Sequence, residues 1–194
     1  MPARGAARSL WQLAGVMALL CFALLPERAA AQQPARFMQS VANELMNAAS
    51  GASANAFHEV FKRHADLPSI GLYSLGSYAN SLSREDRDPF YSGMVGFIAR
   101  YAASQAPQYP VERMVVVGQT EETRTGVYVD TVVYLKGGGS YEVRWWLIRR
   151  SGTFKVGDVQ VLGVWGREEL KRLFEGYISQ NGGNPKALLL ALNR

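Results

Sequence analysis

The middle of the chain, residues 111–161, constrains the fold most strongly. It holds four segments rich in valine, tyrosine and tryptophan, over 111–119, 124–136, 140–150 and 153–161, and residues of this kind favour β-strands. The connections Lys136–Gly139 and Ser151–Gly152 are short and contain glycine, which is typical of hairpin turns. Because such short turns can join only antiparallel neighbours, the sequence predicts a four-stranded antiparallel meander.

Alternation within two of these segments indicates that one face of the sheet is buried. Over 127–134, valines at alternate positions are interleaved with Tyr128, Asp130 and Tyr134. Over 142–147, Trp145 and its apolar neighbours two positions away are interleaved with Glu142 and Arg144. Side chains at alternate positions of a strand point to opposite faces, so the valines and Trp145 are expected to face the core.

Apolar residues at helical spacing flank the predicted sheet on both sides. Before it they recur over 37–48, 57–64, 67–78 and 90–101, with helix-start signals at 66–68 and 83–86. After it they recur over 170–177 and 188–192, on either side of a break at 181–183. Helices, then a sheet, then helices predict an α+β fold in which the helices cover one face of a bent sheet.

The N-terminal segment predicts a cleavable secretory signal peptide. Arg4 and Arg8 precede an apolar run over 10–25, and small residues at Ala29 and Ala31 form a cleavage site. The run is shorter than the roughly 20 residues that a membrane-spanning helix needs. We therefore expect residues 1–31 to be removed and residues 32–194 to form a single domain outside the cytoplasm.

Removal of this segment limits the chemistry that the mature chain can carry. Cys21, the only cysteine, leaves with it, which excludes disulfides, thiol chemistry and cysteine metal sites. The net charge falls from +5 to +3, because three arginines and one glutamate are lost. A charge this small is not typical of a nucleic-acid-binding protein.

Candidate catalytic motifs in the remaining chain are weak. His58 and His64 lie six residues apart, which fits no common metal-binding spacing on a helix. The segment 71–76 has one residue too many for a nucleophile elbow, and the glycines at 137–139 lack the lysine and following helix of a phosphate-binding loop. We therefore expect no enzymatic activity, no metal and no cofactor.

Several segments resemble the MlaC, or toluene-tolerance, family. Residues 152–164, Gly-Thr-Phe-Lys-Val-Gly-Asp-Val-Gln-Val-Leu-Gly-Val, are similar to the late strand of that family. Residues 66–76 and 88–101 resemble its central helices, and the break at 181–183 with the short leucine-rich helix after it resembles its ending. The chain departs from the family pattern at Leu162, where an acidic residue is common, and at Trp165, where a serine is usual.

The resemblance implies a fold and a function. The fold is a bent four-stranded sheet of the NTF2/cystatin-like kind, covered by helices, with an apolar cavity between them. The function is that of a periplasmic carrier of phospholipid, whose partners are an inner-membrane MCE/ABC transporter complex and an outer-membrane lipoprotein complex. Hopanoid-associated relatives leave a polycyclic lipid open as cargo. An NTF2-like periplasmic enzyme and a ligand-free adaptor are the alternatives from other classes.

The lipid-binding residues are predicted from spacing, which selects the face, and from the resemblance, which assigns the role. The helices are expected to contribute Phe57, Phe61, Ile70, Phe90, Met94, Phe97, Tyr101 and Phe174. The sheet is expected to contribute Val117, Val129, Val133, Trp145, Leu147 and Val159.

Overall fold

A computed structural model describes residues 25–194, with side chains from Gln33 onward. The chain divides into two compact units, residues 1–33 and 34–194, and the second contains the whole sheet. Helix α2 (Leu25–Ser50) is the first element described. Residues 1–24 of the predicted signal peptide lie outside the described part of the chain.

The sheet is an antiparallel meander of five strands in the order β1-β2-β3-β4-β5. Its strands are, in turn, β1 (Val111–Glu122), β2 (Val127–Leu135), β3 (Ser140–Arg150), β4 (Thr153–Val161) and β5 (Val164–Trp165). The predicted order and direction of the four long strands are confirmed. The predicted number of strands is wrong by one, since the two residues of β5 add to the edge of β4.

The sheet is bent by irregularities in its pairing. Opposite Trp146 and Leu147 of β3, the partner residues are Asp158 and Val156, so Gly157 is left over as a bulge. Between Val117 and Glu121 the pairing of β1 with β2 also shifts, next to Gly118, whose φ is +71°. Extra residues of this kind increase the local twist and bend of a strand.

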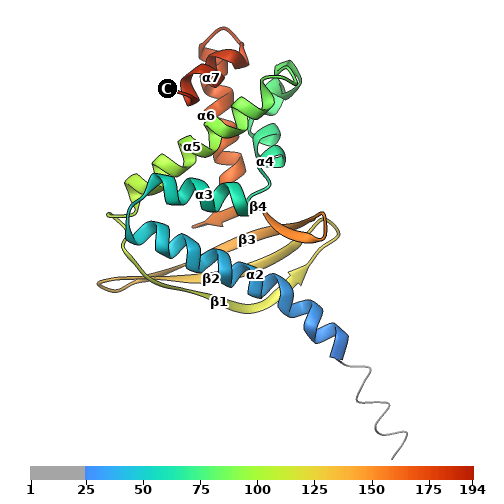
Figure 1. Ribbon diagram of the computed structural model, residues 1–194, viewed down its shortest axis with the longest axis vertical. Helices are drawn as coiled ribbons and strands as arrows, with labels where there is room; N and C mark the ends of the chain where they lie inside the picture. Colours follow the sequence, from blue (N-terminus) through green and yellow to red (C-terminus); the bar gives the residue numbers. More distant parts are fainter. Residues whose placement is uncertain (1–24) are drawn as a thin grey trace, which may run out of the picture. The chain divides into compact units, whose positions relative to one another are not determined.

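In Figure 1, α2 runs along the sheet and the other helices are gathered above it. They are α3 (Ala54–His64), α4 (Leu67–Ser74), the 3₁₀ helix η1 (Gly76–Ser81), α5 (Arg87–Gln105), α6 (Gly166–Gln180) and α7 (Pro185–Leu192). The predicted helix over 67–78 is split into α4 and η1, because Gly76 adopts a left-handed φ of +52° that ends the helix. The predicted helix start at 83–86 is a turn in which the Ser83 hydroxyl accepts from the backbone N–H of Asp86, and α5 begins one residue later.

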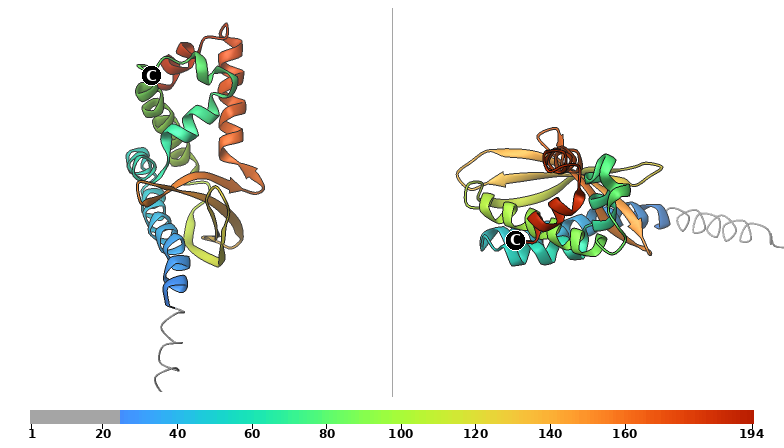
Figure 2. Two further views of the ribbon diagram at one scale, coloured as in Figure 1. Left: turned by 90° about the vertical axis from the view of Figure 1, so that its right-hand side faces the viewer. Right: turned by 90° about the horizontal axis from the view of Figure 1, so that it is seen from above.

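Two large apolar clusters position the helices. In one, Met38 and Val41 of α2 pack on the valines, Trp145 and Leu147 of the sheet, which confirms the predicted buried face. In the other, the side chains of α4, η1, α5, α6 and α7 pack on one another around Phe90 and Phe174. Figure 2 shows these later helices gathered beside the sheet rather than flat upon it.

Candidate functional site

A largely apolar cavity lies between the sheet and helices α2 to α6. Its volume is about 480 Å³, which is within the range of small-molecule binding pockets. The walls come from α2, α3, α4, α5 and α6 together with β3 and β4. The apolar lining residues are Val41, Leu45, Val60, Phe61, Ala65, Leu67, Ile70, Met94, Val95, Phe97, Ile98, Tyr101, Trp145, Val156, Val159, Gly166, Leu170 and Leu173.

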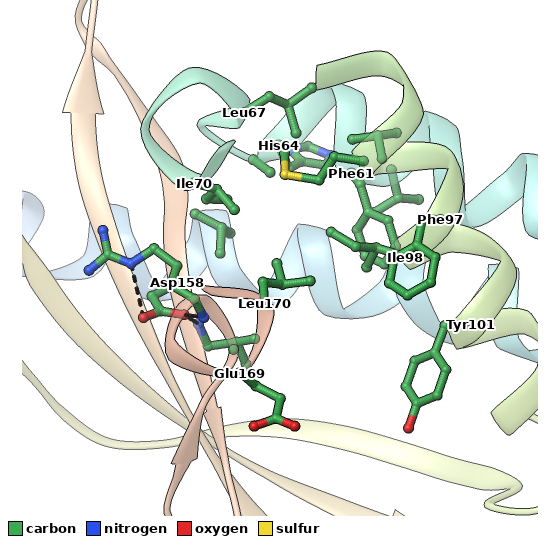
Figure 3. Close-up of a pocket in the computed structure, with 18 of the residues that line it drawn as sticks. Phe61, His64, Leu67, Ile70, Phe97, Ile98, Tyr101, Asp158, Glu169 and Leu170 are labelled. Carbon is green, nitrogen blue, oxygen red and sulfur yellow. Dashed lines mark hydrogen bonds and ion pairs between the residues drawn. The ribbon is translucent and has the colours of Figure 1, made fainter. Parts of the chain in front are cut away.

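The helices that form the cavity walls carry apolar side chains over a wide part of their surface. On α5, Met94, Phe97 and Ile98 pack in the helical cluster and also line the cavity. Tyr101 continues this apolar surface to the mouth of the cavity. Figure 3 shows Phe97 and Tyr101 on one side of the cavity and Ile70 and Leu170 on the other. A helix that is apolar over so wide an arc can face its neighbours and the cavity at once.

The wall formed by α4 and α5 depends on a close approach. A Cβ atom at Gly71 would lie 2.7 Å from Cδ1 of Tyr91, closer than carbon atoms pack. Glycine at this position lets α4 lie against α5 without displacing the Tyr91 ring. The sequence therefore specifies this wall through one missing side chain as well as through the apolar residues.

The mouth of the cavity carries apolar side chains in contact with solvent. Tyr101 is 62% exposed and Leu173 is 47% exposed, yet both line the cavity. Val161, two residues beyond Val159 on the same side of β4, is 38% exposed. The apolar surface of the interior thus continues to the outside of the molecule.

The polar lining residues each have a protein partner. His64 lies with Nε2 3.0 Å from a Glu44 carboxylate oxygen. Asp158, which is buried, accepts from the backbone N–H of Arg167 at 3.0 Å and from its Nε at 3.1 Å. Paired in this way, these groups can border a hydrocarbon-filled space without a large desolvation cost.

Glu169 lies at the mouth and is paired with a neighbour on the same helix. Its carboxylate accepts hydrogen bonds from the Arg172 guanidinium, which lowers the pKa of Glu169 below its ordinary value. In Figure 3 the carboxylate points to the same side as the Tyr101 hydroxyl. The rim of the cavity therefore combines apolar surface with a solvent-exposed ion pair.

Seven of the fourteen predicted lipid-binding residues line this cavity. They are Phe61, Ile70, Met94, Phe97, Tyr101, Trp145 and Val159. They come from α3, α4, α5, β3 and β4, and the fold brings them around one space although they span 98 positions of sequence. Their placement agrees with the expected wall, while their lipid-binding role stays a prediction.

Six other predicted residues are buried against protein rather than against the cavity. Val129, Val133 and Leu147 pack in the cluster between α2 and the sheet, and Phe90 and Phe174 pack together with ring centroids 6.1 Å apart in the helical cluster. Phe57 packs with small residues of α2 and α5. Their prediction as cavity residues is corrected, since they fill the core that supports the cavity wall.

Val117 is placed on the opposite face of the sheet. It pairs with Asp130, whereas the inward-facing Val133 pairs with Met114, and cross-strand partners share a face. Val111, Met114 and Val116 are the residues of β1 that pack against the core. The prediction is therefore wrong by one residue, and such a shift moves a side chain from one face to the other.

Several lining residues were not predicted. Leu170 and Leu173 belong to the apolar face expected over 170–177, and Ile98 belongs to the one expected over 90–101. Val95 lies about one turn before Ile98 on α5. Helical spacing places Leu170, Leu173 and Ile98 on apolar helix faces. It gives no reason to assign them to the cavity in preference to Phe174, which fills the core.

The histidines and strand aspartates occupy separate places. His58 is on α3 beside Glu59, with 3.4 Å between Nδ1 and the carboxylate, and Asp130 binds Arg144 on the outer face of the sheet through two contacts of 2.8 and 2.9 Å. Within residues 25–194, no three His, Cys, Asp or Glu side chains lie close enough together to hold a metal ion. In the same part of the chain, no helix is both long and apolar enough to cross a membrane.

Comparison with solved structures finds proteins of similar fold. A phospholipid-binding protein from Ralstonia solanacearum, solved in complex with a phospholipid, aligns with a TM-score of 0.65 at 18% identity, over 82% of this chain and 94% of that one. A putative NTF2-like transpeptidase from Campylobacter jejuni aligns with a TM-score of only 0.32 at 17% identity, over 50% of this chain and 89% of that one. The first alignment confirms the α+β fold with its antiparallel sheet.

Comparison at the level of sequence identifies the family. A search of curated protein sequences finds no match. The family model described as MlaC protein matches residues 29–194, which is nearly the whole described chain. The resemblance read from residues 152–164 and from the order of the helices is therefore confirmed, and the chain belongs to the MlaC family.

Proposed function

We propose that this protein is a carrier that binds the acyl chains of a phospholipid in the apolar cavity and moves the lipid through an aqueous compartment. The observation that carries the proposal is the cavity itself, walled by apolar side chains and open through Tyr101 and Leu173. The Ralstonia solanacearum protein of the same fold was solved with a phospholipid bound, which supports this choice of ligand.

The energetics of lipid transfer explain what such a carrier must supply. Exposing one methylene group to water costs roughly 0.8 kcal/mol, so a lipid with about 30 methylenes faces a barrier on the order of 20 kcal/mol in crossing water alone. Apolar side chains around the tails remove most of this barrier. No bond is made or broken, so a catalytic group is not required.

The alternatives differ in what the cavity must contain. An enzyme on this scaffold needs an acid or base free to meet a substrate, but the lining carboxylates of Asp158 and Glu169 are held by arginines and His64 lies against Glu44. A ligand-free adaptor needs no cavity of about 480 Å³. A polycyclic lipid such as a hopanoid remains the second candidate cargo, because an apolar wall accepts rings as well as chains.

The predicted signal peptide at the N-terminus indicates the cellular location of the protein. We propose that residues 1–31 are removed on export and that the mature chain, beginning at Gln32, works in the periplasm. Family membership supports an inner-membrane MCE/ABC transporter complex and an outer-membrane lipoprotein complex as its partners. Mass spectrometry of the exported protein should find Gln32 at the N-terminus, and a mature protein that retains Met1 would contradict this part of the proposal.

Native mass spectrometry tests the proposed cargo. The full chain should be expressed with export and purified without added lipid, then measured intact and after extraction into organic solvent. We expect a complex heavier than the protein by one phospholipid. A triterpenoid mass would assign the hopanoid alternative, and protein that is free of lipid both before and after incubation with phospholipid vesicles would refute the carrier.

A further inference from the structure

Trp145 places an indole ring in the wall of the cavity. The residue lies on β3, is 8% exposed and is in contact with both the cavity and the cluster beneath α2. An indole ring carries one polar atom, the Nε1–H donor. A donor aimed into a hydrocarbon-filled space would be left without a partner, which is costly in a nonpolar medium.

Thr131 on the neighbouring strand takes up this donor. Trp145 Nε1 donates to Thr131 Oγ1 at 2.9 Å, and the Thr131 hydroxyl donates in turn to the carbonyl oxygen of Val143 at 3.3 Å. Thr131 is fully buried and pairs with Val143 across the strands. The hydrogen bonds therefore run along the sheet, away from the cavity.

The next residue shows that the sheet does not satisfy every indole in this way. Trp146 points to the other face, stacked under the Arg167 guanidinium at 4.6 Å, and its Nε1 is buried without a hydrogen-bond partner. A specific acceptor is thus supplied on the cavity side, at a position where valine would fill nearly the same volume. This contrast assigns Thr131 a role beyond packing.

We propose that Thr131 is a specificity-determining positioning residue for the ligand site, an inference that rests on the proposed lipid-binding function. By holding the Trp145 N–H within the sheet, Thr131 makes this wall present only carbon and hydrogen atoms. The wall then selects unsubstituted hydrocarbon and disfavours tails or rings that carry a hydroxyl or oxo group at the depth of Trp145.

The test compares two probes that differ by one hydroxyl. Palmitate and a mid-chain hydroxypalmitate would each displace a fluorescent fatty acid from the wild-type chain, from Thr131→Val and from Thr131→Ser. Thr131→Val frees the indole donor, so the preference for palmitate should fall by between about twofold and tenfold, the value of one neutral hydrogen bond. Thr131→Ser keeps the acceptor and should match the wild type.

A double variant separates the indole donor from any change in packing. Thr131→Val combined with Trp145→Phe removes the donor as well as its acceptor, so the palmitate preference should return to the wild-type value. An unchanged preference in Thr131→Val, or an equal loss in Thr131→Ser, would overturn the inference. Failure of the wild-type chain to bind either palmitate or phospholipid would instead refute the proposed function.

Proton exchange at the indole gives a readout that does not require the valine variant to fold. In ¹⁵N-labelled wild-type protein and in Thr131→Ser, the Trp145 indole N–H should exchange slowly with solvent whether or not lipid is bound. Rapid exchange in lipid-free wild-type protein would show that the donor is open to the cavity and would overturn the inference.

Discussion

Three leucines in different environments allow one substitution to separate ligand binding from folding. Leu147 is fully buried in the cluster between α2 and the sheet, and Leu173 lies at the mouth of the cavity with 47% of its surface exposed. Leu190 on α7 is 63% exposed and does not line the cavity. Changing each to aspartate introduces the same charge at a core site, a mouth site and a control site.

The expected magnitudes follow from these exposures. At Leu147 the carboxylate would be buried without a partner, at a cost of several kcal/mol, which is comparable with the roughly 5–15 kcal/mol that stabilises a whole domain. At Leu173 the carboxylate stays in water when the cavity is empty, so the cost to folding is small. In the complex, the lipid would lose part of the roughly 1.5–3 kcal/mol that a buried leucine contributes. The bound acyl chain would also remove water from the carboxylate. The affinity for the lipid should therefore fall by at least about tenfold.

Two assays on all three variants separate stability from lipid binding. They are thermal unfolding and the retention of a radiolabelled phospholipid. We expect Leu147→Asp to be unfolded, Leu173→Asp to be folded but depleted of lipid, and Leu190→Asp to match the wild type in both assays. Full lipid retention by Leu173→Asp would mean that the tails do not pass this mouth. An equal loss of lipid in Leu190→Asp would show that the effect of the charge is not specific to the cavity.

Other substitutions test the supports of the cavity. Gly76→Ala should destabilise the protein by at least about 1–2 kcal/mol in a denaturant titration, because φ is +52° at this position and the added Cβ would collide with the Glu175 carboxylate. Asp158→Ala removes a buried partner of Arg167 and should lower the melting temperature more than Asp130→Ala, whose ion pair with Arg144 is about one-third exposed; equal shifts would contradict this ranking. Hydrogen bonds from the backbone and side chain of Ser77 lower the pKa of Glu175, so its contribution to stability is present above the unfolded-state value and is lost as the pH falls through the folded-state value. Glu175→Gln should therefore be less stable than the wild type at neutral pH, with a difference that shrinks below about pH 4, as measured by melting at both pH values.

The fold could be predicted well from the sequence because its signals are local. The glycine turns at 137–139 and 151–152 fix neighbouring strands as antiparallel, and alternation fixes which face of β2 and β3 is buried. The short β5 gave no such signal, since two residues cannot show alternation. In β1 the consecutive valines at 115–117 have no polar neighbour to set the register, and this is why Val117 was assigned to the wrong face.

The cavity could be predicted only in part, for a different physical reason. Periodicity shows that a side chain avoids water, but it does not show whether the space beyond it is filled by protein or by a ligand. Phe90 and Phe97 lie on the same helix and have the same apolar character, yet Phe90 is packed in the core whereas Phe97 also lines the cavity. The difference arises from the positions of α4 and α6, which are set by contacts far away in the sequence.

Photo-crosslinking from a lipid tail shows directly whether the acyl chains occupy the cavity. A phospholipid with a diazirine near the end of one acyl chain would be loaded into the wild-type protein, irradiated, and its attachment sites mapped by peptide mass spectrometry. We expect attachment within 60–70, 94–101 and 170–173, the helical segments that line the cavity. Attachment confined to the outer face of the sheet, around Tyr128 and Arg144, would contradict the claim that the acyl chains occupy this cavity.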